Sequence, residues 1–206
     1  MILEACVETY QEALMAQNNG ANRIELCSHL ELDGLTPDFG LLEKVCNTLK
    51  IPVMVMIRPR GGNFVYLETE IKKMEQEIAL AKKLGASGIV FGLLTRDNMI
   101  DMANTRRLVI AASPLPVTFH KAIDAMQNPA DGVRQLLRIE GITRILTSGG
   151  KPTAMEGAVK IQEMIKVTDG KIKILVAGKV IHSNRDEIAA LTGATELHGR
   201  RIVGEL

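Results

Sequence analysis

Short apolar segments alternate with amphipathic segments along the whole chain. Eight of the apolar segments have the length of buried strands, and seven segments with apolar residues at helical spacing lie between them. The predicted strands are 2–7, 23–27, 51–57, 88–92, 116–120, 143–147, 171–177 and 195–198. The predicted helices are 8–19, 36–49, 68–84, 101–112, 128–140, 154–167 and 183–191. For the second helix we expect Thr36 as the N-cap and Pro37 as the first residue.

This strict alternation of strands and helices predicts right-handed crossovers and a parallel sheet. Eight such units close most naturally into a (β/α)8 TIM barrel, which we expect to form a single domain over residues 1–206. Only residues 199–206 follow the last strand, so the eighth helix is expected to be missing or minimal, or its place to be covered by a partner subunit. An open doubly wound sheet is the alternative, and the number of strands makes it less favourable.

Composition narrows the classes of function. The chain has 25 Lys and Arg against 24 Asp and Glu, so no excess of charge favours nucleic acid or a membrane surface as partner. Aromatic residues are only 3% and Trp is absent, which argues against stacking of bases or sugars. No basic and apolar leader and no run of membrane-spanning length occurs. The number of cysteines is odd, three, and no export signal is evident, which is typical of reduced thiols. We therefore expect a cytoplasmic protein.

Polar side chains lie at the carboxyl ends of the predicted strands, where this fold places its chemistry. Side chains alternate along a strand, and those expected to point into the barrel are Glu4, Cys6, Glu25, Cys27, Arg58, Thr118, His120, Thr147 or Ser148, Glu196 and His198. Burying an unpaired carboxylate is costly, so Glu4 and Glu25 need partners. The partners that we expect for them are Arg58, His120 and His198.

Binding of a soft metal is the first chemistry that this set of residues allows. Cys6 and Cys27 fall at equivalent points of two neighbouring strands, which lie only ~5 Å apart in a sheet. Two thiolates at that spacing, together with His120 or His198, suit Cu(I) or Zn. The alternative is that both cysteines are small buried apolar residues, as free cysteines commonly are.

Catalysis on a small anionic molecule is the second chemistry. Glu4 and Glu25 are candidates for general acid and base, with His120 or His198 as a proton shuttle. Arg58 would hold a carboxylate or phosphate of the substrate. The alternative is a structural network of ion pairs that keeps the barrel closed, and the sequence leaves open whether the protein is an enzyme.

Glycine-rich turns suggest two places for an anion. Arg58 and Arg60 precede a Gly61-Gly62 pair at the end of the third strand, and Ser148-Gly149-Gly150 follows the sixth strand, with the Gly178-Lys179 turn close by. Guanidinium groups and free N–H groups bind carboxylate and phosphate. The alternative is that the arginines are solvated surface residues and that the glycine pairs form ordinary tight turns. No organic cofactor is evident.

Seven motifs resemble the CutC copper-homeostasis family in order and spacing: Leu3-Glu-Ala-Cys-Val, Asn22-Arg-Ile-Glu-Leu-Cys-Ser, Gly34-Leu-Thr-Pro, Val55-Met-Ile-Arg-Pro-Arg-Gly-Gly, Val90-Phe-Gly, Leu115-Pro-Val-Thr-Phe-His and Arg144-Ile-Leu-Thr-Ser-Gly-Gly. The resemblance implies a cytoplasmic TIM barrel, often a homodimer, that is linked to copper tolerance and binds Cu(I). It places the copper ligands on Cys6 and Cys27, and the polar residues of the mouth on Glu4, Glu25, Arg58, Arg60, His120, Asp124 and His198.

This sequence departs from the family pattern in three places. Lys121 stands where an arginine is usual, Ala177-Gly-Lys-Val-Ile replaces a glycine-rich turn, and the segment after His198 is short.

From the resemblance, the expected function is copper homeostasis with Cu(I) bound by thiolates at the barrel mouth. The alternative is a TIM-barrel enzyme that acts on a small carboxylated or phosphorylated metabolite through the Glu, Arg and His cluster.

Overall fold

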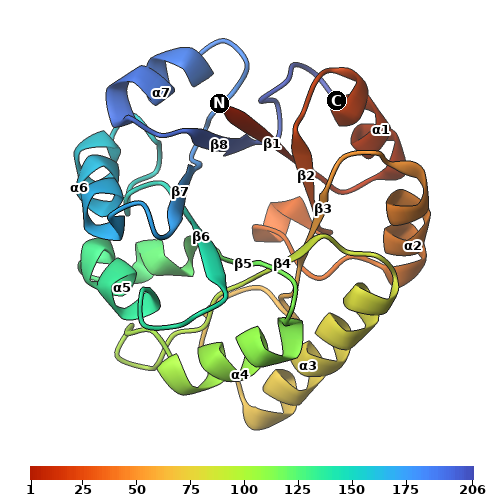
Figure 1. The fold of residues 1–206 in the computed structure, drawn as a ribbon, viewed down its shortest axis with the longest axis horizontal. Coiled ribbons are helices and arrows are strands. Elements are labelled where there is room, and N and C mark those ends of the chain that lie inside the picture. Colours follow the sequence, from red (N-terminus) through yellow and green to blue (C-terminus); the bar gives the residue numbers. More distant parts are fainter.

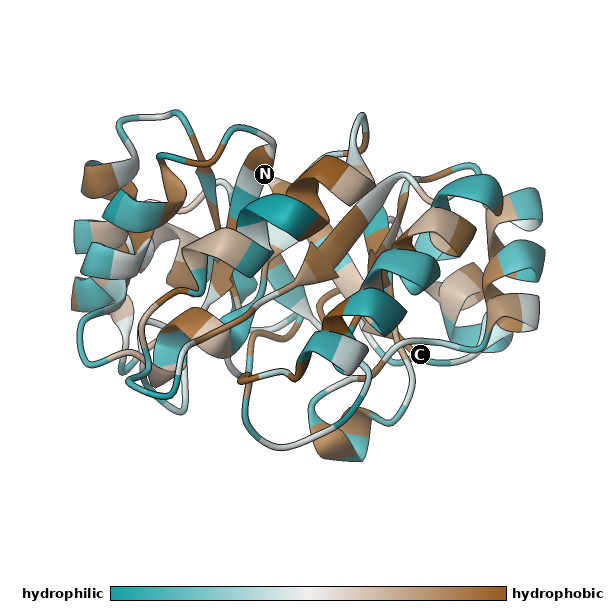
Figure 2. Cartoon of the chain, turned by 90° about the horizontal axis from the view of Figure 1, so that it is seen from below, coloured by the Kyte–Doolittle hydropathy of each residue, from teal (hydrophilic) through white to brown (hydrophobic).

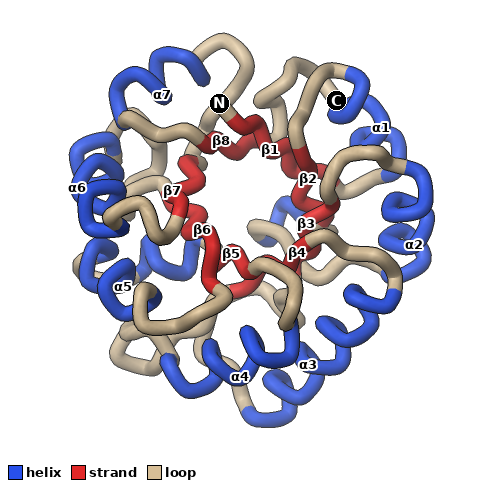
Figure 3. The backbone as a smooth tube through the Cα atoms, in the orientation of Figure 1, coloured by secondary structure: helices blue, strands red, loops and turns tan.

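The chain folds into a closed barrel of eight parallel strands in sequence order, each paired with the next and β8 paired with β1. The computed structural model describes residues 1–206. Figures 1 and 3 show the ring of strands inside a ring of helices. The strands are β1 (Ile2–Val7), β2 (Arg23–Leu26), β3 (Val53–Met56), β4 (Gly88–Phe91), β5 (Val117–Phe119), β6 (Ile142–Thr147), β7 (Lys173–Val176) and β8 (Glu196–Gly199).

Seven α-helices connect the strands, and they carry apolar and polar segments side by side (Figure 2). They are α1 (Tyr10–Asn18), α2 (Phe39–Thr48), α3 (Glu68–Lys83), α4 (Met102–Ala112), α5 (Pro129–Leu136), α6 (Ala158–Thr168) and α7 (Arg185–Thr192). Residues 200–206 form turns rather than a helix, and only coil lies between α7 and α1 in Figure 3. The predicted (β/α)8 barrel without an eighth helix is therefore confirmed. None of the helices combines the length and the apolarity that a membrane span requires.

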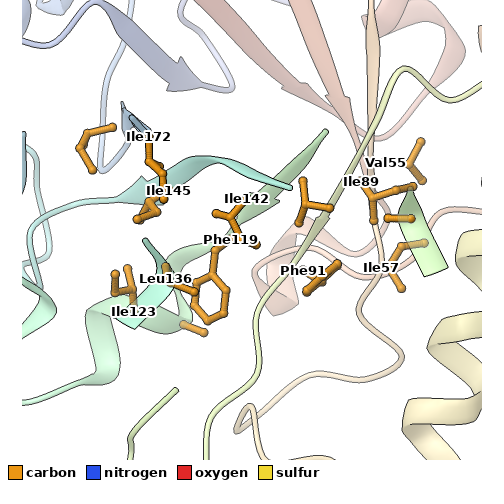
Figure 4. Packing of buried hydrophobic residues seen from close by; sticks show 14 of the residues in the cluster. Val55, Ile57, Ile89, Phe91, Phe119, Ile123, Leu136, Ile142, Ile145 and Ile172 are labelled. Carbon is orange, nitrogen blue, oxygen red and sulfur yellow. The ribbon is translucent and has the colours of Figure 1, made fainter. Parts of the chain in front are cut away.

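Alternation along each strand divides its side chains between two environments. On β3, Val53 and Val55 belong to the large apolar core, whereas Met54 and Met56 belong to a separate small cluster with the buried cysteines. The large core lies between strands and helices, and Figure 4 shows part of it, including Phe91 and Phe119. The polar residues of the opposite parity are thereby turned into the barrel.

Helix α2 begins two residues later than the sequence predicts. Its N-cap is Asp38, whose Oδ1 accepts a hydrogen bond from the backbone N–H of Leu41 at 3.0 Å. The prediction of Thr36 as cap and Pro37 as first residue is wrong. The Thr36 hydroxyl instead accepts from the N–H of Arg58 and donates to Glu77, at 2.9 Å each. Thr36 therefore ties the end of β3 to α3, and this tertiary role competes with capping.

Two more predicted helices are too long. Helix α5 ends at Leu136, and residues 137–140 form turns. Helix α6 begins at Ala158, because the preceding segment is held by the loop after β7: the N–H of Ala154 donates to the carbonyl of Gly178 at 2.9 Å. This contact brings the loops that follow β6 and β7 together at the barrel mouth.

Removing the observed cap should destabilise the protein. We expect Asp38→Ala to lower the free energy of unfolding by about 1 kcal/mol, because the first turn of α2 loses its side-chain acceptor. Urea unfolding followed by circular dichroism measures this difference. Asp38→Asn is the matched control, since asparagine caps equally well. A stability of Asp38→Ala equal to that of the wild type would show that the cap contributes nothing.

Candidate functional site

A buried cluster rich in sulfur lies inside the barrel along the first four strands. It consists of Cys6, Cys27, Met54, Met56 and Val90. The Sγ atoms of the two cysteines are 3.5 Å apart. In the strand register Cys6 lies opposite Glu25, not opposite Cys27. The expectation of equivalent positions is therefore wrong by two residues, and the sulfur atoms meet as diagonal neighbours on one face.

The two methionines of this cluster were not predicted as part of the site. The methyl group of Met56 and the sulfur of Cys27 both border Gly34, where an added Cβ would lie 3.7 and 3.6 Å from them. The signal was present in the sequence, because Met54 and Met56 alternate along one strand and must share a face. A thioether is a soft ligand, like a thiolate.

A buried ionic network borders the sulfur cluster. Arg23 on β2 donates to Glu4 on β1 and, at 2.6 Å, to Glu196 on β8. Arg144 on β6 also donates to Glu196, at 2.9 Å. Glu4 lies 2.8 Å from Nδ1 of His198. The carboxylates therefore have the cationic partners that their burial requires.

Glu25 connects the network to the thiols. Its Oε2 accepts a hydrogen bond from the thiol of Cys6 at 3.4 Å and lies 3.7 Å from Nε2 of His198. Its Oε1 is buried and has no hydrogen-bond partner. Two sets of three side chains have ligand atoms within 4.8 Å of one another: Cys6, Glu25 and Cys27, and Glu4, Glu25 and His198. Glu25 is common to both sets.

The two carboxyl groups next to His198 have pKa values shifted in opposite directions. Burial by itself would raise the pKa of Glu4, but the hydrogen bond from His198 and the charge of Arg23 outweigh it and lower the pKa to about 2. Burial raises the pKa of Glu25 above its ordinary 4.5, although the charge of His198 opposes this shift. Burial would lower the pKa of His198, but the charge of Glu25 and hydrogen bonds to Cys6 and Glu4 raise it well above 6.5.

Arg58 does not pair with either carboxylate, contrary to the prediction. Its guanidinium is buried and donates to three backbone carbonyls: those of Leu32 at 2.8 Å, Gly34 at 3.1 Å and Gly62 at 3.1 Å. Glu4 pairs with His198, as expected, and with Arg23, which the sequence analysis missed because it stands at the start of its strand. In a tilted barrel that position is level with Glu4 on the neighbouring strand.

His120 also lies apart from the two carboxylates, with which it makes no ion pair. Its Nδ1 accepts from the N–H of Ala122 at 3.2 Å, and its ring packs on Phe64 with centroids 5.1 Å apart. The same Phe64 ring has the Arg58 guanidinium 5.0 Å from its centre. Burial and the charge of Arg58 lower the pKa of His120 to about 3, so the imidazole is neutral. The structure therefore brings His198, and not His120, to Glu4 and Glu25.

The predicted anion sites are occupied by groups of the chain itself. Arg60 donates to Glu70 at 2.6 Å and to the carbonyl of Val65 at 2.7 Å. In the Ser148-Gly149-Gly150 turn, the N–H groups of Ser148 and Gly150 both donate to Asp124, at 2.9 Å each, and Gly149 donates to Thr147. The turn binds a carboxylate, as its composition suggests, but this carboxylate belongs to Asp124.

A cavity of about 600 Å³ opens at the ends of β7, β8 and β1. Cys6 and His198 line it, so the sulfur cluster and the ionic network both reach the barrel mouth here. The remaining lining residues are Leu30, Lys121, Pro152, Ala177, Gly178, Lys179, Val180, Ile181, Gly199, Arg200 and Arg201.

Removing Arg23 should be severely destabilising. We expect Arg23→Met to lower the free energy of unfolding by about 3 kcal/mol or more, because Glu4 and Glu196 each lose a buried cation. Guanidinium chloride unfolding measures the loss. Arg134→Met removes an exposed ion pair with Asp131 and should cost at most about 1 kcal/mol. Equal losses in the two variants would contradict a special role for the buried network.

Carboxyl NMR should separate the two glutamates. The Glu4 resonance should stay unchanged from pH 7 down to pH 4, because its pKa is about 2, and that of Glu25 should titrate above pH 4.5. The lowered pKa means that Glu4 contributes stability above pH 4.5, which is lost as the pH falls toward 2. The contribution of Glu25 has the opposite sign: it is present below pH 4.5 and is lost as the pH rises through the raised pKa. The two resonances titrating together near pH 4.5 would refute this assignment.

Comparison with known proteins shows the family of this chain. The family model described as the CutC family matches residues 1–203. A protein of Histophilus somni named family protein CutC is 42% identical over 198 residues, which are 96% of this chain and 81% of that protein. A human protein named copper homeostasis protein cutC homolog is 43% identical over 197 residues, 96% of this chain and 72% of that protein.

Solved structures give the same result. The crystal structure of a CutC protein from Streptococcus agalactiae superposes with a TM-score of 0.92 at 33% identity and covers 98% of this chain and 99% of that one. An aldolase superposes with a TM-score of 0.71 at 13% identity, covering 99% of this chain and 91% of that one, and shares the fold alone. The chain therefore belongs to the CutC family.

Proposed function

We propose that this protein acts in copper homeostasis by binding Cu(I) between Cys6 and Cys27. The observation that supports the proposal is the pair of thiol sulfur atoms 3.5 Å apart in a cluster that also contains Met54 and Met56. Cu(I) is a soft cation and prefers thiolate and thioether ligands. The names of the relatives, which refer to copper homeostasis, point the same way.

The site would bind the metal in exchange for protons. The hydrogen bond with Cys27 and burial raise the pKa of Cys6 well above 9, so its thiol is protonated at neutral pH. A metal ion must displace that proton to bind the thiolate. Glu25 accepts the hydrogen bond of this thiol, and Cys6 lines the cavity at the mouth, which gives the ion a path from solvent.

The location and assembly that go with this function are also proposals. Sulfur atoms this close would be oxidised in an oxidising compartment, which would remove both ligands, so the cytoplasm is the location that we propose. The homodimer implied by the family resemblance is the proposed assembly, and light scattering at micromolar protein concentration tests it.

Catalysis on a small carboxylated or phosphorylated molecule is the second candidate. It is favoured by one observation: two buried carboxyl groups with opposite pKa shifts flank His198, which lines the cavity. Pairs of groups with pKa values moved apart are typical of acid and base catalysis. In this role Glu25 would exchange a proton with the substrate through His198.

Titration with Cu(I) in the presence of a competing chelator, under anaerobic reducing conditions, tests the main proposal. The wild type should bind one Cu(I) per chain, and the double variant Cys6→Ser, Cys27→Ser should lose this binding. Met54→Leu with Met56→Leu should weaken it by about tenfold, because the soft neighbours are replaced at nearly constant volume. Cys46→Ser is the matched control, since Cys46 lies on α2 and outside the sulfur cluster. Unchanged affinity in the double cysteine variant would refute the thiolate site.

A further inference from the structure

The cavity at the ends of β7, β8 and β1 is lined by four Lys and Arg side chains, with His198 beside them, and by no Asp or Glu. Two of the cations already have partners: Arg200 lies 2.8 Å from Glu12, and Arg201 lies 3.3 Å from Glu205. The other two, Lys121 and Lys179, make no ion pair. Lys121 reaches the cavity from the short 3-10 helix that follows β5 (Lys121–Ala125), and Lys179 reaches it from the loop after β7. Two uncompensated ammonium groups at one cavity favour an anionic ligand.

The loop after β7 holds the backbone of Lys179 in the left-handed conformation. Lys179 has a φ of 55° and Gly178 a φ of 103°, and residues with side chains rarely adopt this left-handed region. Tight packing maintains it: an added Cβ on Gly199 would lie 2.1 Å from the carbonyl oxygen of Val180. Asn184 donates to the carbonyl of Lys179 at 3.0 Å. Such local strain tends to occur at ligand sites, where it fixes a group in place before binding.

The same loop offers free backbone donors. The N–H groups of Gly178, Lys179 and Val180 donate to no acceptor in the protein, whereas the next one, of Ile181, donates to Asn184 at 2.8 Å. Successive N–H groups in a left-handed turn form a concavity that binds anions. Loops after the last strands of such barrels often hold a phosphate group.

We propose that this cavity binds a small phosphorylated molecule, whose phosphoryl group is held by the N–H groups of Gly178, Lys179 and Val180 and by the ammonium groups of Lys121 and Lys179. Three amide donors and two cations match a dianion with several equivalent oxygen atoms better than a single carboxylate. The volume of about 600 Å³ leaves room for the rest of a small metabolite. That part would lie beside Cys6 and His198, which line the same cavity.

The neighbouring Ser148-Gly149-Gly150 turn explains why the ligand belongs at the later loop. Its N–H groups are already taken by Asp124 and Thr147. The loop after β7 packs directly on it, because an added Cβ on Gly178 would lie 2.8 Å from the Cβ of Ser148. The carboxylate of Asp124 therefore occupies the N–H groups of the loop after β6. Of the two loops, the one after β7 has N–H groups that are free to bind a ligand.

Isothermal titration of metal-free protein at constant ionic strength tests the site, with inorganic phosphate, ribose 5-phosphate and succinate as probes. Inorganic phosphate should bind, and ribose 5-phosphate should bind more tightly. Lys179→Asn and Lys121→Met should each weaken phosphate binding about tenfold, as expected for loss of a charge-assisted contact. Asparagine tolerates the left-handed conformation, so Lys179→Asn should fold. Lys179→Gly, which removes the side chain without backbone strain, should weaken binding to the same extent.

Lys173→Met is the matched control. It removes one positive charge from an exposed position at the opposite end of β7 and should leave phosphate affinity unchanged. An equal loss in this variant would show that net charge, and not the cavity, binds phosphate. Absence of phosphate binding, or unchanged affinity when Lys121→Met and Lys179→Asn are combined, would overturn the proposal. Succinate binding as tightly as ribose 5-phosphate would overturn the choice of a phosphoryl group.

Discussion

The buried guanidinium of Arg23 joins the strands that close the barrel. It stands on β2 and binds Glu4 of β1 and Glu196 of β8, so it spans the junction at which the first and last strands meet. Removing these charges from water is costly, and only close mutual pairing compensates the cost. The same interaction orients Glu4, which then fixes His198 by a hydrogen bond. Closure of the fold and placement of the site therefore depend on one set of contacts.

From this network a line of contacts leads to the thiols. His198 lies beside Glu25, Glu25 accepts the hydrogen bond of Cys6, and the sulfur of Cys6 touches that of Cys27. Glu4 and His198 lie on the β8 side of the thiols, the methionine sulfur atoms lie on β3, and Glu25 on β2 stands between the two groups, opposite Met54. A soft cation at the sulfur atoms would sit next to groups that exchange protons. A simple pair of exposed thiols would have no such proton-exchanging groups beside it.

Other polar residues at the barrel mouth stabilise the fold instead of binding a ligand. Arg58 ties loops together through backbone carbonyls, and Asp124 satisfies the donors of the turn after β6. These residues look functional in a sequence because their types bind anions. In the structure their capacity is used internally. The loop after β7 differs, because the N–H groups of Gly178, Lys179 and Val180 donate to no acceptor in the protein and Lys179 makes no ion pair.

The sequence by itself determined the eight-stranded barrel, because hydrophobic periodicity is a local property, and it put Glu4, Cys6, Glu25 and Cys27 on inward-facing positions, because side chains alternate along a strand. The family could be identified from motifs spread over the chain. The tertiary structure decided which of these groups meet. Strand tilt set Arg23 rather than Arg58 beside Glu4. Packing inside the barrel added Met54 and Met56 to the thiols, and burial near Arg58 left His120 neutral against Phe64. The tertiary structure also gave the capping role to Asp38, because the Thr36 hydroxyl is hydrogen-bonded to Arg58 and Glu77. Periodicity fixes the direction of a side chain, but its partner depends on register between strands far apart in the chain, which no local pattern encodes.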